Sequence, residues 1–415
     1  SVKNTLVMRG YMAYNEHRKQ GGTSMKVLVI GGGASGLTAA LTASEDPHSD
    51  VHLAERQARV ARKLLATGNG RCNLTNKNMQ PEIFRGEHPE IVQSVLKQFS
   101  MEDTLEFFGQ IGVAFVDRNG WVYPRSNQAK CIPELMVQKA HSLKVKIKTR
   151  EKVKDIYKEN GRWKVRTEGW IYECDRVILA NGSSASQVPG SDGSGYAIAE
   201  NLGHRIIRPL PALTGLRCRG TAFSAWAGVR TEGEVTLLLD GKPFCKERGE
   251  LQLTDYGISG IPVFQLSRYA VRALAEGKIA ELSVNFFPEY TTEELTKLLD
   301  KRRELCPYQS AAELLVGLLP DKLIRAFRKQ KDLIQTLTSY RLTVKESTGL
   351  EQAQVCSGGV DTTQVNTETL ESHIHKGIYF AGELLDIDGP CGGYNLQWAW
   401  SSGAVAGLHS AREKL

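Results

Sequence analysis

The stretch KVLVIGGGASG, Lys26 to Gly36, decides the fold of this chain of 415 residues. Its first five residues read as a short buried strand, and the next six form the pattern G-x-G-x-x-G. Apolar residues then recur at helical spacing from Leu37 onward. A glycine turn between a strand and a helix favours a dinucleotide site, because free N–H groups and the helix dipole face the phosphates.

Each glycine of this turn has its own mechanical role. Gly31 allows the tight turn, Gly33 lets the backbone approach a pyrophosphate, and Gly36 lets the helix lie close to the strand. The pattern predicts an α/β fold with a Rossmann-type domain. Its expected phosphate contacts are Gly31, Gly33, Ala34, Ser35 and Gly36.

An acidic residue stands where the ribose of the nucleotide is expected. A second strand, residues 51–54, ends at Glu55, which is 19 residues after Gly36. A carboxylate there suits a ribose diol and repels a 2′-phosphate. Arg56 weakens that exclusion. The turn predicts the AMP half of FAD or NAD but does not separate the two.

The C-terminal segment favours FAD. Residues 377–381 read as another buried strand, closed by Gly382-Glu383, whose carboxylate suits the ribityl chain. Residues 392–396 open a helix whose N-terminal amides would face the N1/O2 edge of an isoalloxazine. Ala399, Gly403 and Gly407 share one face, which permits close helix packing. The alternative is a glycine-rich packing element without a ligand.

A third element agrees with FAD. The strand at residues 176–180 ends in Ala180-Asn181-Gly182, a turn at which FAD domains leave the central sheet. Before it, residues 152–156 and 163–167 alternate in polarity around Asn160-Gly161 and predict a hairpin. Such a hairpin offers backbone to adenine, here at Val153.

Five motifs, in this order, resemble one family of bacterial NAD(P)/FAD-dependent oxidoreductases. They are GGGASG (31–36), KLLATGNGRCNLTN (63–76), YPRS (123–126), LTDYGISG (253–260) and AGELLDIDGPCGGYNLQWAWSSG (381–403). The similarity extends over about residues 25–408. The family includes 3-dehydro-bile-acid Δ4,6-reductases and enzymes described as aminoacetone oxidases.

The resemblance implies FAD, and the lack of an evident His or Cys attachment motif predicts that it is not covalently bound. The residue patterns and the resemblance together predict these cofactor contacts: Gly31, Gly33, Ala34, Ser35, Gly36, Glu55, Arg56, Thr67, Gly68, Asn69, Arg71, Val153, Ala180, Gly182, Gly382, Glu383, Asn395 and Leu396. The chain departs from the family at Asn181-Gly182-Ser183, where relatives have Thr-Gly-Gly, and at Gly260-Ile261-Pro262, where Gly-Pro is usual.

Length and composition bound the remaining possibilities. A chain of this length predicts two or three domains. Of the net charge of +7, the first 24 residues carry +3, and no basic cluster is interleaved with aromatics, so nucleic-acid binding is not expected. No apolar run is long enough for a membrane span. Eight scattered cysteines without C-x-x-C argue against a metal site and indicate reduced thiols in a cytoplasm.

The positions of the FAD motifs predict the domain organisation. Residues 1–24 are expected to form a disordered leader, and residues 25–209 with 345–415 the FAD-binding domain. Residues 210–344 are expected to be an inserted β-rich unit with a helical cap over the substrate. Strands are predicted at 235–239 and 280–287, and helices at 293–301, 310–319 and 321–328.

The chemistry remains open among three hypotheses. The first is reduction of an activated C=C bond of an apolar, steroid-like substrate, the second is oxidation of a small amine by oxygen, and the third is flavin binding without turnover. No second glycine fingerprint is present, so NADH or NADPH would visit the flavin transiently, and oxygen is the alternative partner. The catalytic candidates are Tyr394, Cys391 and Tyr256; Cys391 and Tyr394 are also explained by packing. The sequence leaves the oligomeric state open.

Overall fold

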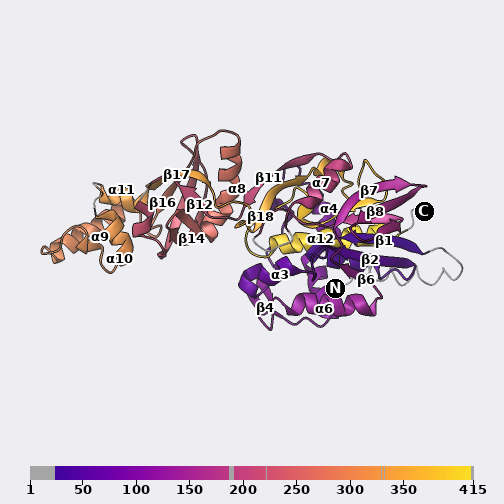
Figure 1. Cartoon of the computed structure of the whole chain (residues 1–415). Helices are drawn as coiled ribbons and strands as arrows, with labels where there is room; N and C mark the ends of the chain where they lie inside the picture. The colour runs from indigo at the N-terminus through magenta and orange to yellow at the C-terminus, as the bar shows by residue number, and fades with distance from the viewer. Residues whose placement is uncertain (1–23, 187–190, 221, 329, 331, 413–415) are drawn as a thin grey trace.

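The computed structural model describes residues 24–186, 191–220, 222–328, 330 and 332–412. The predicted leader, apart from its last residue, lies outside these residues. Figure 1 shows two lobes joined end to end, which we call the Rossmann lobe and the barrel lobe. Each lobe has its own hydrophobic core.

A five-stranded parallel sheet forms the centre of the Rossmann lobe. Its order is β19 (Ile378–Phe380), β10 (Arg176–Leu179), β1 (Met25–Ile30), β2 (Ser49–Glu55) and β6 (Lys146–Thr149). Helix α2 (Ala34–Ala43) follows the glycine turn and packs against α12 (Tyr394–Ala411). The Rossmann-type α/β fold predicted from the glycine turn is therefore confirmed.

Smaller sheets and helices surround this centre. The predicted hairpin is present as β7 and β8, and β9 extends it to three strands. A second small sheet has the order β3-β5-β4. The bounds are β7 (Val153–Glu159), β8 (Arg162–Thr167), β9 (Ile171–Cys174), β3 (Thr75–Asn76), β4 (Phe115–Arg118), β5 (Trp121–Pro124), α3 (Arg62–Ala66), α4 (Ile91–Gln98), α5 (Met101–Gln110), α6 (Cys131–Ser142) and α7 (Ser194–Asn201).

The barrel lobe is a closed six-stranded barrel with helices at its far end (Figure 1). Going round the barrel, the strands are β12 (Leu216–Cys218), β15 (Gly257–Gly260), β14 (Lys242–Thr254), β13 (Arg230–Leu239), β16 (Ala280–Asn285) and β17 (Tyr340–Ser347). The helices are α9 (Thr292–Leu305), α10 (Asp321–Phe327) and α11 (Leu333–Thr338). This lobe occupies the part of the chain for which an insertion was predicted.

The helix predicted at residues 310–319 is wrong. The structure has only a short 3-10 turn there, Glu313–Leu315. Gly317 has φ +83°, a left-handed conformation that ends a helix.

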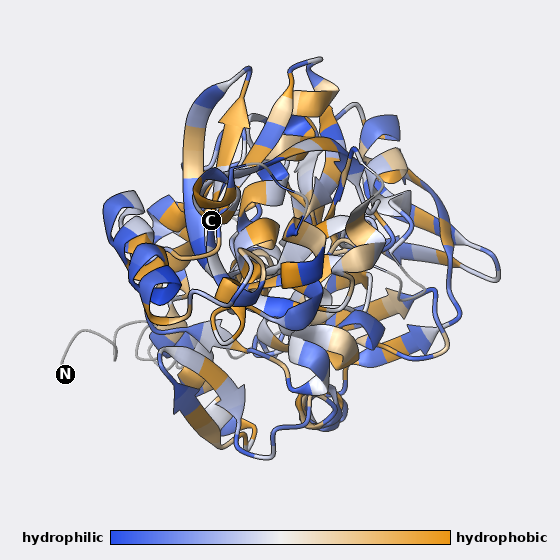
Figure 2. Cartoon of the chain, turned by 90° about the vertical axis from the view of Figure 1, so that its left-hand side faces the viewer, coloured by the Kyte–Doolittle hydropathy of each residue, from blue (hydrophilic) through white to orange (hydrophobic). Residues whose placement is uncertain are grey.

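Helix α8 (Ile261–Ala275) was not predicted, and it lies between the two lobes (Figure 1). It begins after Gly260, whose φ is +106°, with Pro262 in its first turn. Beside it, β11 (Ile206–Ala212) pairs with β18 (Val355–Val360) where the chain passes between the lobes. Helices at the surface are striped with hydrophilic and hydrophobic residues, as expected for elements with one buried face (Figure 2).

Candidate cofactor site

Of the three glycines that define the G-x-G-x-x-G turn after β1, two are crowded and one is open. A Cβ at Gly31 would lie 2.4 Å from the Ala180 carbonyl oxygen, and one at Gly36 would lie 1.8 Å from the Gly31 carbonyl oxygen. These positions hold β1, β10 and α2 together. A Cβ at Gly33 would meet nothing within 4 Å. The turn therefore leaves open space at the N-terminus of α2, where a pyrophosphate can approach.

Glu55 is fixed beside this turn. Its Oε2 accepts a hydrogen bond from the Gly32 N–H (2.7 Å), and its Oε1 accepts one from the Gln57 N–H (2.7 Å). The side chain is 9% exposed. Arg56 forms an ion pair with Asp192. The carboxylate thus lies beside the glycine turn and binds backbone N–H groups there.

A pocket brings together residues that are far apart in sequence. Its lining contains four predicted cofactor residues, Gly31, Glu55, Arg56 and Val153, as well as Asn181. The Oδ1 atom of Asn181 is buried and has no hydrogen-bond partner. An orphaned buried acceptor beside open space fits a ligand that supplies a donor, such as the adenosine end of a dinucleotide.

Helix α12 packs closely against α2 and the glycine turn. A Cβ at Gly403 would lie 2.4 Å from the Ser35 carbonyl oxygen, and one at Gly407 would lie 2.4 Å from the Ala39 carbonyl oxygen. Gly382 is equally close, since its Cβ would lie 2.4 Å from Ser35 Oγ. The close helix packing predicted for Gly403 and Gly407 is therefore present, and its partner is α2.

Glu383 is held by two side chains that the sequence analysis missed. Lys63 Nζ donates to Glu383 Oε2 at 2.6 Å, and Ser183 Oγ donates to the same atom at 3.1 Å. Ala61 N donates to the Gly32 carbonyl oxygen, which ties the start of α3 to the glycine turn. The signals in the sequence were the position of Lys63 in KLLATGNGRCN and the departure at Ser183.

The loop of Thr67 to Arg71 extends into solvent. Gly68, Asn69 and Gly70 are exposed, and all three have left-handed backbone. The loop is stabilised by Cys72 N donating to the Thr67 carbonyl oxygen and by Arg71 Nε donating to the Gly68 carbonyl oxygen. An exposed loop of this kind leaves its surface free for a ligand.

The start of α12 packs closely against β3. A Cβ at Gly393 would lie 2.6 Å from the backbone of Thr75, so this glycine serves contact with β3. The side-chain amide of Asn73 is oriented so that its nitrogen donates to the Thr75 carbonyl oxygen at 3.1 Å and its oxygen accepts from Gly393 N at 3.2 Å. The Asn395 amide bonds to Gly389 N and to the Gly389 carbonyl oxygen, each at 2.8 Å. Leu396 is half-buried.

The three catalytic candidates lie in different surroundings. Tyr394 is buried against Phe84, and its hydroxyl donates to the Asn78 carbonyl oxygen at 3.5 Å. Burial raises the pKa of Cys391 to about 12, so its thiol stays protonated at neutral pH. Tyr256 lies in the turn between β14 and β15, with the Arg217 guanidinium 5.1 Å from its ring centroid.

A buried ion pair joins the lobes next to this region. Arg268 on α8 donates to Asp388 at 2.8 Å, and the two side chains are 9% and 2% exposed. One turn on each side, Gln265 accepts from Cys391 N, and Arg272 donates to Ser357. Helix α8 therefore anchors the barrel lobe to the segment that precedes α12.

The described residues contain no group of three or more His, Cys, Asp or Glu side chains that could hold a metal ion. Within the same residues, none of the helices has the length and apolar character to cross a membrane.

The family model described as HI0933-like protein Rossmann domain matches residues 25–409. The chain belongs to this family. It is 42% identical over 404 residues to a 3-dehydro-bile acid delta(4,6)-reductase of Clostridium scindens, covering 93% of this chain and 99% of the relative. It is 28% identical over 408 residues to a ribosomal RNA dihydrouridine synthase of Haemophilus influenzae, covering 93% and 98%. The predicted family resemblance is confirmed.

Solved structures agree on the fold. The 3-ketosteroid-delta4-(5alpha)-dehydrogenase of Rhodococcus jostii RHA1 superposes with a TM-score of 0.51 at 13% identity, covering 94% of this chain and 97% of that one. The 3-ketosteroid delta1-dehydrogenase of Sterolibacterium denitrificans has a TM-score of 0.51 at 12% identity, covering 94% and 100%. At these identities the two structures show a shared fold.

Proposed function

We propose that this chain is an oxidoreductase that binds FAD without a covalent bond and reduces a C=C bond conjugated to a carbonyl group. The proposed substrate is a 3-oxo-Δ4 or Δ6 bile-acid steroid, and the proposed donor is NADH or NADPH. The observation that carries this proposal is the 42% identity to a 3-dehydro-bile acid delta(4,6)-reductase along nearly the whole of both chains. We also propose that the protein is located in the cytoplasm.

The residues of the site fit FAD. The open space above Gly33 and the unpartnered Asn181 suit the pyrophosphate and the adenosine. Glu55 and Glu383 would accept hydrogen bonds from the ribose and the ribityl chain. When bound, FAD would supply hydride exchange with a substrate carbon. The protein would orient that carbon, exclude water beneath the barrel lobe and deliver a proton to the α-carbon.

The names of the relatives favour reduction over amine oxidation. Saturating Δ4 and Δ6 of a 3-oxo steroid and converting uridine to dihydrouridine share one reaction type, because each removes a C=C bond conjugated with a carbonyl. A small-amine oxidase that releases peroxide would not catalyse this type of reaction. A flavin-binding protein without turnover would not catalyse it either.

The test is anaerobic reoxidation. The FAD-loaded protein is reduced with dithionite and then mixed with a 3-oxo-4-ene steroid acid, with uridine, or with buffer, and flavin absorbance is followed. We expect only the steroid to restore the oxidised spectrum. Reduction of the oxidised protein by a small amine, with peroxide formed in air and no response to the steroid, would replace this function with the oxidase.

A further inference from the structure

Two segments of the Rossmann lobe each carry a net positive charge. Residues 56–77 contain six basic residues and no acidic one, and residues 114–131 contain three basic residues and one acidic residue. The two segments therefore have a net charge of +8, whereas the whole chain has +7. The rest of the chain sums to −1, because its other basic stretches, such as residues 144–154, are offset by acidic residues elsewhere.

Backbone hydrogen bonds join the two segments into one surface. Ala129 N donates to the Gly70 carbonyl oxygen at 2.8 Å, and Leu74 N donates to the Val122 carbonyl oxygen at 2.8 Å. Figure 1 shows α3 and β4 at the same side of the Rossmann lobe, at its end nearer the barrel lobe. The exposed loop of residues 67–71 belongs to this surface.

Three of the nine basic residues are neutralised by carboxylates. Arg56 pairs with Asp192, Lys63 with Glu383, and Lys77 with Asp117. The other six have no carboxylate partner among the described residues, and five of them are exposed while Arg71 is half-buried. We call these six the cationic face: Arg59, Arg62, Arg71, Arg118, Arg125 and Lys130.

Unpaired cations held together repel one another and raise the local concentration of anions. Arg71 and Arg118 illustrate this, since their guanidinium carbons lie 5.8 and 5.3 Å from the ring centroid of one residue, Tyr123. Such an arrangement fits a ligand with several phosphate charges.

We propose that the cationic face docks the phosphate groups of the nicotinamide dinucleotide donor and that it favours NADPH over NADH. This inference rests on the proposed function. Among the described residues a single glycine-turn groove is present, and FAD would occupy it, so the donor needs a different holding surface. NADPH carries a 2′-phosphate in addition to its pyrophosphate, gives up one hydride, and leaves as NADP⁺.

An RNA backbone is the other polyanion that such a face could attract. Binding of single-stranded nucleic acid commonly adds stacking of bases on exposed aromatic rings. The aromatic residues of the two segments do not offer this, because Tyr123 is 6% exposed and Phe115 and Trp121 are half-buried. The face therefore suits a small phosphorylated ligand better.

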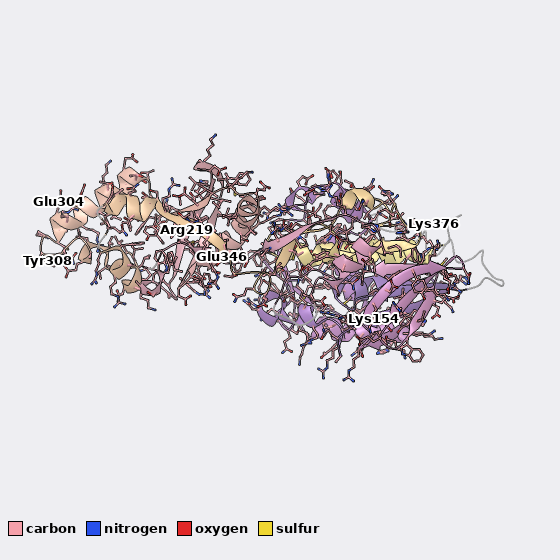
Figure 3. The ribbon with its side chains drawn as sticks, turned by 45° about the horizontal axis from the view of Figure 1, so that its top comes forward. Lys154, Arg219, Glu304, Tyr308, Glu346 and Lys376 are labelled. Carbon is pink, nitrogen blue, oxygen red and sulfur yellow. The ribbon has the colours of Figure 1, made fainter. Side chains whose placement is uncertain are left out.

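The test compares NADPH and NADH in anaerobic stopped-flow reduction of the FAD-loaded protein. In the double variant Arg118→Gln/Arg125→Gln, loss of charge-assisted contacts should weaken NADPH binding about tenfold or more. The reduction rate at saturating NADPH should stay unchanged, and the effect on NADH should be smaller. The control Lys154→Gln removes an exposed charge on β7, on another part of the Rossmann lobe (Figure 3), and should change neither.

Other outcomes would overturn the docking surface. The proposal would be overturned if the double variant bound NADPH and NADH equally more weakly, or if it bound both as tightly as the wild type. It would also be overturned if neither nucleotide reduced the wild-type protein. So would binding of an RNA oligomer that the double variant abolishes while NADPH kinetics stay unchanged. The dithionite experiment separates this inference from the proposed function: steroid can reoxidise the protein even if NADPH does not dock, and NADPH can reduce it even if steroid does not react.

Discussion

The substitution Gly403→Ala tests whether the C-terminal helix supports the glycine turn through close packing. The new Cβ would lie 2.4 Å from the Ser35 carbonyl oxygen and 3.0 Å from Ser35 Cα, and backbone atoms within a helix cannot move alone. Overpacking of this kind costs about 1 to 3 kcal/mol. Alanine offsets up to about 1 kcal/mol of this cost through its higher helix propensity. We expect a net loss of up to about 2 kcal/mol in the free energy of unfolding.

The same change should weaken FAD binding, because Ser35 belongs to the glycine turn. The matched control is Gly109→Ala in α5, where a Cβ would meet nothing within 4 Å. That variant should gain about 0.5 to 1 kcal/mol. Urea unfolding of the apoprotein and fluorescence titration with FAD measure both effects. If Gly403→Ala were as stable as Gly109→Ala and bound FAD like the wild type, the packing argument would be refuted.

Three further predictions follow from the site. Burial raises the pKa of Cys391 to about 12. We therefore expect iodoacetamide at neutral pH to label it more slowly than free cysteine, whose pKa is about 8.5. Peptide mass spectrometry measures the labelling, and a rate equal to that of free cysteine would contradict a protonated thiol. Burial raises the pKa of Asp388 from 3.8 to about 6, so this carboxyl binds a proton more tightly in the folded protein than in the unfolded chain. The free energy of unfolding should therefore fall as the pH rises between these two pKa values. Asp388→Asn should remove that slope in urea unfolding, and an unchanged slope would assign it to other groups. Acid precipitation should release all the yellow colour, whereas colour in the pellet would indicate covalent FAD.

The sequence was sufficient for the parts of the fold that local patterns determine. The strands of the central sheet follow from short apolar runs, and the glycine turn follows from the spacing of Gly31, Gly33 and Gly36. The packing role of Gly403 and Gly407 was predictable from their helical spacing. The partner helix was not, since a periodicity shows which face is small but not what it contacts.

Contacts between distant segments could not be predicted in this way. Closure of the barrel depends on pairing such as Leu216 with Ser347, and no local pattern connects them. The pair of Lys63 and Glu383 is separated by 320 residues. The close contact between the backbones of Gly393 and Thr75 likewise joins distant segments, and only the folded chain reveals it.

The concentration of positive charge was hidden in the sequence for the same reason. Residues 56–77 and 114–131 are modest basic stretches when each is read alone. Folding brings them together through hydrogen bonds between their backbones. A count of charges along the chain therefore missed a surface that the structure assembles.

The identity of the reaction product tests the central claim most directly. The FAD-loaded protein, reduced anaerobically in D₂O, is given one equivalent of a 3-oxo-4-ene steroid acid, and the steroid is analysed by mass spectrometry and NMR. Conjugate reduction predicts a saturated ketone with deuterium at both the β-carbon and the α-carbon, because the N5–H of reduced flavin exchanges with D₂O before the steroid is added. Recovery of unchanged steroid, with the flavin still reduced, would contradict the assignment of this chain as an enone reductase.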